Sequence, residues 1–239
     1  MCSELDKVSS KDSKRVFFHE LGHHLPYATL AVACSLLLIS LLFVFFQDTM
    51  LHGNAHMHSH GCGTNCCHGS GMDILFHTFH YIHIIFAVSG SMVMFYRYAQ
   101  RLVLGIVIGT LSASFFCTLS DVLLPYLAGI MLGKAMDLHI CFFTDFTSVV
   151  PFLIIGALNG LVMFYIKDFK TEANSLNLHF FHTFVSAVAS IFYSIGHGFA
   201  DYHSYLGIFF LLMLGAVVLP CTLADVVVPI IIARMVNKK

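Results

Sequence analysis

Two copies of one short motif carry most of the metal-binding chemistry that this sequence offers. Residues 117–125 read Cys-Thr-Leu-Ser-Asp-Val-Leu-Leu-Pro, and residues 221–229, 104 positions later, read Cys-Thr-Leu-Ala-Asp-Val-Val-Val-Pro. In each copy the thiol and the carboxylate are four residues apart, so on a helix they share a face. The predicted central ligands of a metal ion are Asp121 and Asp225, assisted by Cys117 and Cys221.

The two aspartates lie inside apolar runs, where a charge is costly. An Asp at mid-bilayer costs about 2.5–3.5 kcal/mol on insertion scales, and no Lys or Arg in the apolar segments is available to pair with it. A bound cation or a proton is therefore the natural counter-charge. The alternative is a protonated Asp that hydrogen-bonds to a neighbouring helix.

Histidines occur at helical spacing in the apolar segments that precede each motif. His77, His80 and His83 are three residues apart, so they span about 120° of one helical face. The second half carries His182, and His197 with Asp201 four residues later, where a carboxylate can orient an imidazole ligand. We predict that these residues also bind metal, along a path across the bilayer. The alternative is a set of interfacial histidines at the headgroup level.

The loop of residues 50–73 is rich in histidine and cysteine and contains no Lys or Arg. Its predicted metal ligands are His52, His56, His58, His60, Cys62, Cys66, Cys67 and His68. Imidazole and thiolate suit Zn²⁺, Cu, Ni²⁺ or Fe²⁺, so we predict an external metal-capture loop. The alternative is a loop held by disulfides on an oxidising side of the membrane. A second outer loop, residues 134–144, adds Asp137, His139 and Cys141.

Composition places these residues in a membrane. Hydrophobic residues make up 58% of the chain and charged residues 10%, whereas a soluble domain needs roughly 25% charge. The predicted membrane helices are six apolar segments, at residues 25–46, 74–96, 102–133, 147–166, 178–200 and 204–233. We therefore predict an all-α polytopic protein in a lipid bilayer. The net charge of −1 suggests no nucleic-acid partner, and a homo-oligomer is left open.

The basic residues predict the orientation. With six crossings, eleven of the twelve Lys and Arg residues fall on one side of the membrane, and Lys134 alone falls on the other. By the positive-inside rule both termini are cytoplasmic. We expect a multi-pass protein of a bacterial inner membrane.

A second repeated phrase supports an internal duplication. Phe-His-Thr-Phe occurs at residues 76–79 and again at 181–184, 105 positions later. After a cytoplasmic tail of residues 1–24, we therefore predict two three-helix repeats, residues 25–133 and 134–239. Three crossings is an odd number, so the second repeat is inverted, as in secondary transporters. The alternative is chance similarity between apolar sequences.

Prolines predict interruptions in the long third and sixth segments. Pro125 lies in the third, and Pro220 and Pro229 lie in the sixth. Because proline removes a hydrogen bond from the helix ladder, these helices are expected to be broken near a binding site. The alternative is a long, tilted and kinked helix.

Another function is indicated near the N-terminus. His19-Glu20-Leu21-Gly22-His23 has the zinc-and-base spacing of metalloproteases and resembles the motif of the site-2 intramembrane proteases. One alternative function is thus an intramembrane zinc metalloprotease using His19, Glu20 and His23. Another is a haem-binding membrane cytochrome, because histidine pairs on helices can ligate haem axially.

The repeated motif also resembles a family signature. Residues 221–225, Cys-Thr-Leu-Ala-Asp, are similar to the Cys-[Ser/Thr]-x-x-Asp signature of the predicted permeases related to the arsenic permease ArsP. The resemblance implies a permease. We therefore predict a transporter, not an enzyme, that takes up a divalent transition metal ion such as zinc, iron, nickel or copper, with zinc foremost.

Overall fold

Helices are the only regular elements among the described residues, and no strand occurs there. The computed structural model describes residues 13–52, 71–166 and 172–237. In chain order its elements are α2 (Ser13–His52), α3 (Gly71–Tyr98), α4 (Leu102–Thr118), η2 (Leu119–Leu123), α5 (Leu124–Met131), α6 (Cys141–Thr144), α7 (Phe146–Tyr165), α8 (Glu172–Gly196), η4 (Tyr202–Tyr205), α9 (Leu206–Thr222), η5 (Leu223–Val227) and α10 (Val228–Asn237). The predicted all-α architecture is confirmed.

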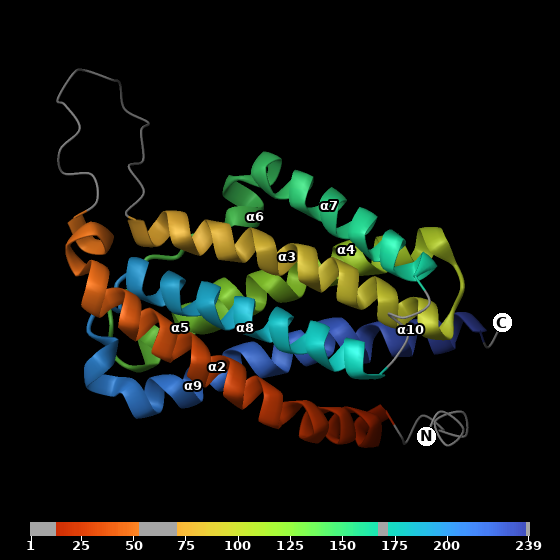
Figure 1. The fold of residues 1–239 in the computed structure, drawn as a ribbon, viewed down its shortest axis with the longest axis horizontal. Helices are drawn as coiled ribbons and strands as arrows, with labels where there is room; N and C mark the ends of the chain where they lie inside the picture. The colour runs from red at the N-terminus through yellow and green to blue at the C-terminus, as the bar shows by residue number, and fades with distance from the viewer. Residues whose placement is uncertain (1–12, 53–70, 167–171, 238–239) are drawn as a thin grey trace.

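Five helical stretches are long and apolar enough to cross a membrane. They are Leu25–Phe45, Gly71–Tyr98, Leu102–Met131, Phe146–Tyr165 and Tyr202–Asn237. Figure 1 shows them running roughly along the long axis of the molecule, with α8 among them. A further long helix, α8, is part of the described chain but is not one of the five apolar stretches.

The helices α3 and α8 form the inner pair of this bundle (Figure 1). Every residue of α8 from 185 to 195 is buried, including the side chains of Ser186, Ser190 and Ser194. Because protein rather than lipid covers this stretch, hydroxyl and imidazole groups can find partners there. This accounts for the more polar sequence of α8.

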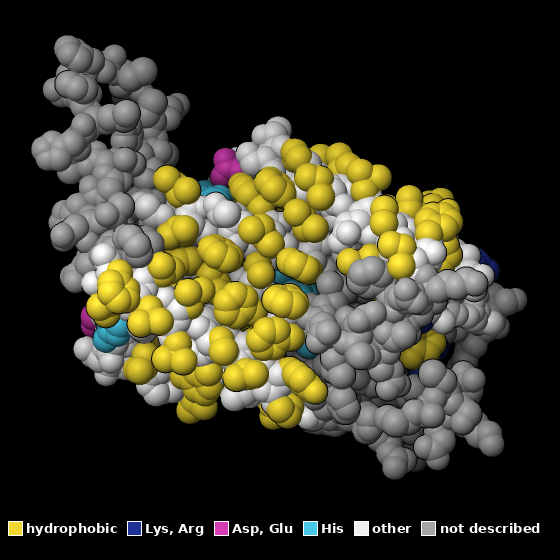
Figure 2. Space-filling view, in the orientation of Figure 1, with side chains coloured by type: hydrophobic (Ala, Val, Ile, Leu, Met, Phe, Trp, Pro, Cys, Tyr) yellow, Lys and Arg dark blue, Asp and Glu magenta, His cyan; other side chains and the backbone are white. Residues whose placement is uncertain are grey.

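Apolar side chains cover the outside of the bundle. Figure 2 shows hydrophobic side chains over most of the described part of the visible face, with few charged ones between the two ends. Large apolar residues are exposed on several helices, for example Val44 at 76%, Val103 at 73% and Leu111 at 66%. A soluble monomer rarely exposes so large a continuous apolar surface. The chain is therefore a multi-pass membrane protein whose outer surface contacts the lipid bilayer.

The first helix is longer than the predicted segment. The helix α2 begins at Ser13, within the predicted tail, and ends at His52. Its 40 residues measure about 60 Å at ~1.5 Å per residue, so it exceeds a hydrocarbon core of ~30 Å. The polar residues before Leu25 extend the helix beyond the apolar part, because helical hydrogen bonds do not require apolar side chains. Residues 19–23 are thus helical, but the side chains of His19, Glu20 and His23 lie outside the described part.

The two repeated motifs contain the two π-helical turns of the described chain. The turn η2 covers residues 119–123, and η5 covers residues 223–227. In the first, the Leu124 N–H donates to the Leu119 carbonyl, five residues back, and in the second Val228 N–H donates to Leu223 in the same way. The predicted breaks at Pro125 and Pro229 are therefore π turns within continuous helical stretches. Such turns are frequent at functional sites.

The prolines after the π turns explain why serines of other helices hydrogen-bond to the backbone carbonyls of these turns. After an i→i−5 bond from Leu124, the next donor in the same pattern would be Pro125, which has no N–H. The carbonyl of Ser120 is thereby left without a helical partner. The Ser190 hydroxyl of α8 lies 3.0 Å from it and 2.8 Å from the Ser186 carbonyl of its own helix, so its proton is shared between the two. In the other copy the Ala224 carbonyl accepts from the Ser91 hydroxyl of α3 at 2.7 Å. Each π turn is thus satisfied by a serine of the inner helix pair.

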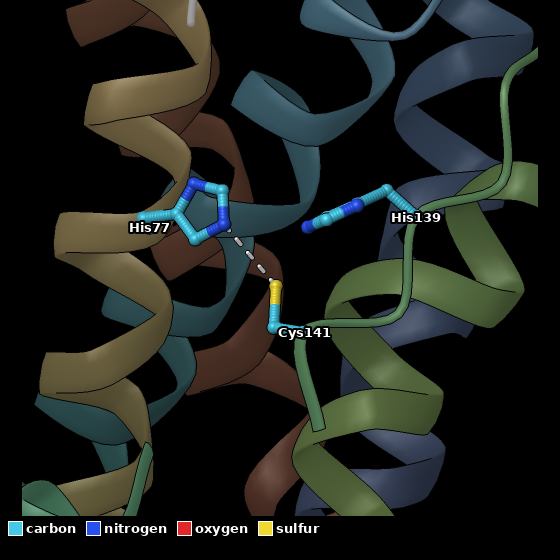
Figure 3. A group of neighbouring side chains, drawn as sticks. All are labelled: His77, His139 and Cys141. Atoms are coloured by element: carbon cyan, nitrogen blue, oxygen red, sulfur yellow. Dashed lines mark hydrogen bonds between the residues drawn. The ribbon is translucent and has the colours of Figure 1, made fainter. Parts of the chain in front are cut away.

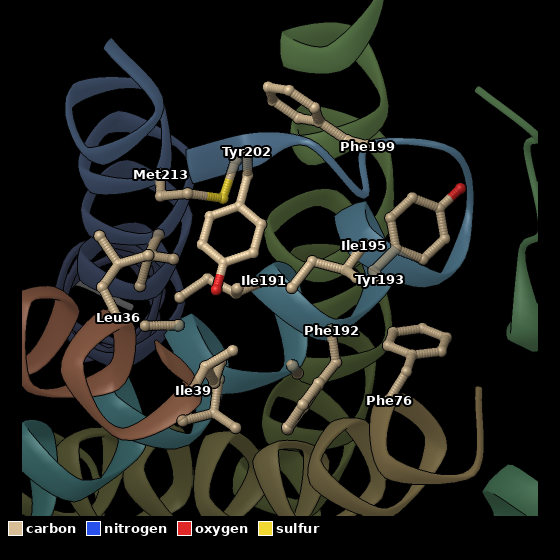
Figure 4. Packing of buried hydrophobic residues seen from close by; sticks show 14 of the residues in the cluster. Leu36, Ile39, Phe76, Ile191, Phe192, Tyr193, Ile195, Phe199, Tyr202 and Met213 are labelled. Atoms are coloured by element: carbon tan, nitrogen blue, oxygen red, sulfur yellow. The ribbon is translucent and has the colours of Figure 1, made fainter. Parts of the chain in front are cut away.

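Aromatic and aliphatic side chains fill the space around the inner pair. Figure 4 shows part of one buried cluster, in which Phe76 of α3, Phe192 and Tyr193 of α8, and Leu36 of α2 pack together. A second buried cluster joins α3, α4 and α7. Cys221 belongs to the first cluster and Cys117 to the second, so the two motif thiols lie where the apolar core meets the polar centre.

The carbonyl pairing yields a stability prediction. We expect Ser190→Ala to lower the free energy of unfolding by about 1–3 kcal/mol, because it leaves the buried Ser120 carbonyl unsatisfied. The matched control is Ser194→Ala, since within the described part of the chain that equally buried hydroxyl bonds to its own helix, at the Ser190 carbonyl, and to no other element. Thermal unfolding in detergent checks this. Equal melting temperatures for the two variants would contradict it.

Candidate metal centre

Asp121 is the most fully hydrogen-bonded side chain in the membrane interior. It lies in η2 with no exposed surface. Its Oδ2 accepts from Nδ1 of His80 at 2.8 Å and from Nδ1 of His83 at 2.6 Å. Its Oδ1 accepts from the hydroxyls of Ser120 and Ser186, both at 2.8 Å. Four donors use the whole accepting capacity of a carboxylate, so in this arrangement Asp121 orients two imidazoles.

Asp225 takes the same position in η5, with fewer partners. Nδ1 of His179 lies 3.3 Å from its Oδ2, and Nδ1 of His182 is hydrogen-bonded to the same oxygen. Its Oδ1 is buried and has no hydrogen-bond partner. The residue is 7% exposed. Gly90 of α3 packs directly against this carboxylate, because a Cβ there would lie 3.1 Å from Oδ1. Asp225 therefore keeps one oxygen free to bind a further group.

A contact between two imidazoles joins the two halves of the centre. Nε2 of His83 lies 2.6 Å from Nε2 of His182. Since neither ring can use Nδ1, which faces a carboxylate, the free ligand atoms of both rings converge at this point. The Cys117 and Cys221 Sγ atoms each lie 3.8 Å from Nε2 of His83. The residues His83, His182 and Cys221 thus place one donor atom each within 4.8 Å of one another.

The side chains of this centre could hold a transition-metal ion. Two imidazoles and two thiols match the ligand set of tetrahedral zinc. In metal sites of proteins a ligating histidine usually donates its other N–H to a carboxylate, which fixes the tautomer and the ring. Asp121 and Asp225 occupy those carboxylate positions. All of the ligating side chains are at most 2% exposed, so water does not compete for them.

The histidines of the centre form two equivalent pairs. His80 and His83 hydrogen-bond to Asp121, and His179 and His182 hydrogen-bond to Asp225. The two pairs are 99 positions apart in the sequence. Ser91 and Ser190, which bond the two π turns, are also 99 positions apart. The contacts thus differ from the Phe-His-Thr-Phe alignment, which paired His77 with His182. The predicted ligand set did not include His179, although the shared His-x-x-His spacing pairs it with His182 in the sequence.

A second group of ligands lies apart from this centre, where α3 begins. His77 of α3, His139 of the segment before α6, and Cys141 of α6 place their donor atoms within 4.8 Å of one another. Figure 3 shows the two rings pointing toward each other across the Cys141 thiol. Burial raises the pKa of this thiol to about 12. The predicted ligand His77 therefore belongs to this outer group.

Two predicted ligands are separated by the end of α8. The helix ends at Gly196, and Gly198 has a φ of 125°, so His197 and Asp201 do not have the helical i, i+4 relation that we predicted. The His197 ring stacks on Tyr193 instead, with centroids 4.2 Å apart. Asp201 accepts from Lys134 Nζ at 2.6 Å, and this hydrogen bond lowers the pKa of the Asp201 carboxyl.

The predicted capture loop lies largely outside the described residues. His52 is the last residue of α2, but its side chain is outside the described part. The same holds for the whole of His56, His58, His60, Cys62, Cys66, Cys67 and His68. Metal capture by this loop stays a prediction.

The unequal hydrogen bonding of the two aspartates yields a prediction. We expect Asp121→Ala to destabilise the metal-free protein more than Asp225→Ala, by about 1–3 kcal/mol, because it also deprives two buried hydroxyls of their acceptor. Thermal unfolding in detergent with a chelator present measures both. The prediction fails if Asp225→Ala is the more damaging change.

Comparisons with known proteins add no homologue. The chain matches no protein-family model, no curated protein and no solved structure. The resemblance of residues 221–225 to the ArsP-related permeases stays a prediction carried by that motif. The account of function below depends on the residues of this chain alone.

Proposed function

We propose that the protein is a membrane transporter for a divalent transition metal ion, with zinc as the preferred substrate. One observation carries the proposal: two His–Asp–Cys half-sites, one from each half of the chain, meet through His83 and His182 inside a membrane bundle. A buried ionisable residue in a membrane helix is expensive and marks a substrate or ion path. Eight such side chains in one place need a positively charged occupant or protons to be tolerated.

The ion is held by ligands from both halves in this proposal. Its ligand atoms are Nε2 of His83, Nε2 of His182, and the thiolates of Cys117 and Cys221. In a tetrahedral zinc site with Zn–N bonds of ~2.0–2.1 Å, two nitrogens lie about 3.3 Å apart. The two Nε2 atoms, at 2.6 Å, must therefore separate slightly when metal binds. Binding is thereby coupled to the relative position of α3 and α8.

An inverted repeat would turn this coupling into transport. In secondary transporters of that kind, one repeat rocks against the other around a fixed site near the midplane. The equivalent histidine pairs, π turns and serine contacts support a repeat whose halves meet at the ligands. With α8 included, six crossings leave the start of α2 and the end of α10 at the same end of the molecule (Figure 1).

The orientation of the protein in the membrane, and with it the direction of transport, follows from the distribution of Arg and Lys residues. Arg97, Arg101 and Arg234 belong to the end of the bundle that carries both of those helix ends, whereas Lys134 belongs to the other. We propose that the arginine-bearing end is cytoplasmic, in a bacterial inner membrane. The His- and Cys-rich loop of residues 50–73 then faces outward, which favours uptake.

The other two functions receive no support from the centre. A haem needs its iron between the two axial histidines, and the 2.6 Å contact between His83 and His182 leaves no room for it. A protease using His19, Glu20 and His23 makes no use of the buried ligands. We therefore propose transport rather than catalysis.

Transport measured in vesicles tests this function. We expect purified wild-type protein in liposomes to accumulate Zn²⁺, and His83→Ala to reduce the initial rate about 10-fold or more, since it removes a ligand shared by both halves. The control is Cys34→Ser, because Cys34 is a free, half-buried cysteine of α2 outside every ligand group. An unchanged rate in His83→Ala that remains folded would refute the central site.

Gly90 offers a gentler test of the same centre. We expect Gly90→Ala to weaken zinc affinity about 10-fold, because its Cβ would crowd Asp225, which positions His179 and His182. Gly215→Ala is the matched control: a Cβ at that position in α9 meets no atom within 4 Å. Isothermal titration with Zn²⁺ compares them. Equal affinities would show that the Asp225 carboxylate has no influence on the site.

A further inference from the structure

The group of His77, His139 and Cys141 near the start of α3 shares no residue with the central one. Nε2 of His77 lies 3.4 Å from Sγ of Cys141, and the His77 and His139 ring centroids are 5.5 Å apart. Ligand atoms of a tetrahedral zinc ion lie about 3.3–3.7 Å apart, given bonds of ~2.0–2.1 Å to nitrogen and ~2.3 Å to sulfur. The group therefore needs little movement to enclose an ion (Figure 3).

The His77 ring is already held in the tautomer that a metal requires. Its Nδ1 lies 2.8 Å from the Asp73 carbonyl oxygen. A carbonyl can only accept, so Nδ1 carries the proton and the lone pair is on Nε2, which faces Cys141. This is the arrangement by which a backbone carbonyl orients a metal-ligating histidine.

His139 contributes a buried nitrogen without a hydrogen-bond partner. Its Nε2 is inaccessible to solvent and makes no hydrogen bond, although the Asp145 carboxylate lies 3.5 Å away. The backbone around it is anchored to α8: the His139 N–H donates to the Tyr193 hydroxyl at 3.3 Å, and that hydroxyl donates to the Asp137 carbonyl at 3.0 Å. An orphaned buried nitrogen on an anchored segment indicates a missing ligand.

We propose that His77, His139 and Cys141 form a second metal site, at the outer end of the bundle, for a borderline-soft divalent ion such as Zn²⁺. Three protein ligands leave a fourth position open, as in sites that exchange a bound group. The Asp145 carboxylate lies 3.5 Å from Nε2 of His139. One turn along α3, His80 contacts Asp121 of the central site. The role as first binding site of an incoming ion rests on the proposed function, whereas metal binding itself does not.

Metal stoichiometry of the full chain tests this site. The parent for these measurements has the loop substitutions Cys62→Ser, Cys66→Ser, Cys67→Ser, His52→Ala, His56→Ala, His58→Ala, His60→Ala and His68→Ala, so that loop ligands do not contribute. We expect His139→Ala to lose one equivalent of Zn²⁺ per chain by elemental analysis. His139→Cys supplies another ligand and should retain the equivalent, as should Cys34→Ser. His139 is a third exposed and outside the apolar stretches, so these changes spare the core.

Cobalt substitution identifies the ligands independently. With both central thiols removed by Cys117→Ser and Cys221→Ser, Co²⁺ bound at the outer site should give a thiolate charge-transfer band, and the further change Cys141→Ser should abolish it. If His139→Ala and Cys141→Ser bind as much Zn²⁺ and Co²⁺ as the parent, the outer site is wrong. If they lose an equivalent but His83→Ala transports normally, the outer site stands and the central transport site fails.

Discussion

The contact between His83 and His182 is the constraint around which the bundle is arranged. Two imidazole nitrogens 2.6 Å apart require one donor and one acceptor. Each ring also directs Nδ1 at an aspartate that is buried in a different helix. Four helical stretches therefore meet at one point, and none of them can slide without breaking a buried hydrogen bond. The cost of an unsatisfied polar group in lipid makes this arrangement hard to loosen.

The π turns explain how an aspartate can be placed at that point. In a regular helix the carbonyls of Ser120 and Ala224 would accept from Leu124 and Val228, but the π turns divert these donors to Leu119 and Leu223. The next residues in the i→i−5 pattern, the prolines at 125 and 229, have no N–H. The serines of α3 and α8 donate to these carbonyls instead. The same substitution of partners ties each motif to the inner helix of the opposite half. The motif thus supplies both a ligand-orienting carboxylate and the means of docking it.

The two half-sites are alike in position but not in hydrogen bonding. Ser120 donates to Asp121, whereas the corresponding residue of the other motif is Ala224, which has no hydroxyl. Asp225 consequently retains a free buried oxygen. A symmetric site would offer an ion the same environment from both sides, whereas of these two aspartates only Asp225, on the η5 side, has an unpartnered oxygen. The difference arises from two hydroxyls that only Asp121 receives, those of Ser120 in the motif and Ser186 in α8.

Composition and local pattern were enough to predict the membrane, the helices and most residues of the buried His, Cys and Asp groups. Apolar runs report a lipid environment directly, and Cys117, Asp121, Cys221 and Asp225 stand out because lipid excludes such residues. Orientation and transport stay predictions of the same kind. These conclusions depend on residue type alone, so no folding of the chain was needed to reach them.

The partners of those residues were decided only by tertiary packing. Sequence spacing joined His197 to Asp201, but α8 ends between them and Lys134 takes the carboxylate. The repeated phrase also aligned His77 with His182. In the bundle, however, His77 lies beside His139 and Cys141, and the histidine that contacts His182 is His83. Spacing along one helix predicts which side chains share a face. Which faces of two helices contact each other depends on how each helix is rotated about its axis and how far it is shifted along the membrane normal. Both are determined by packing across the whole core.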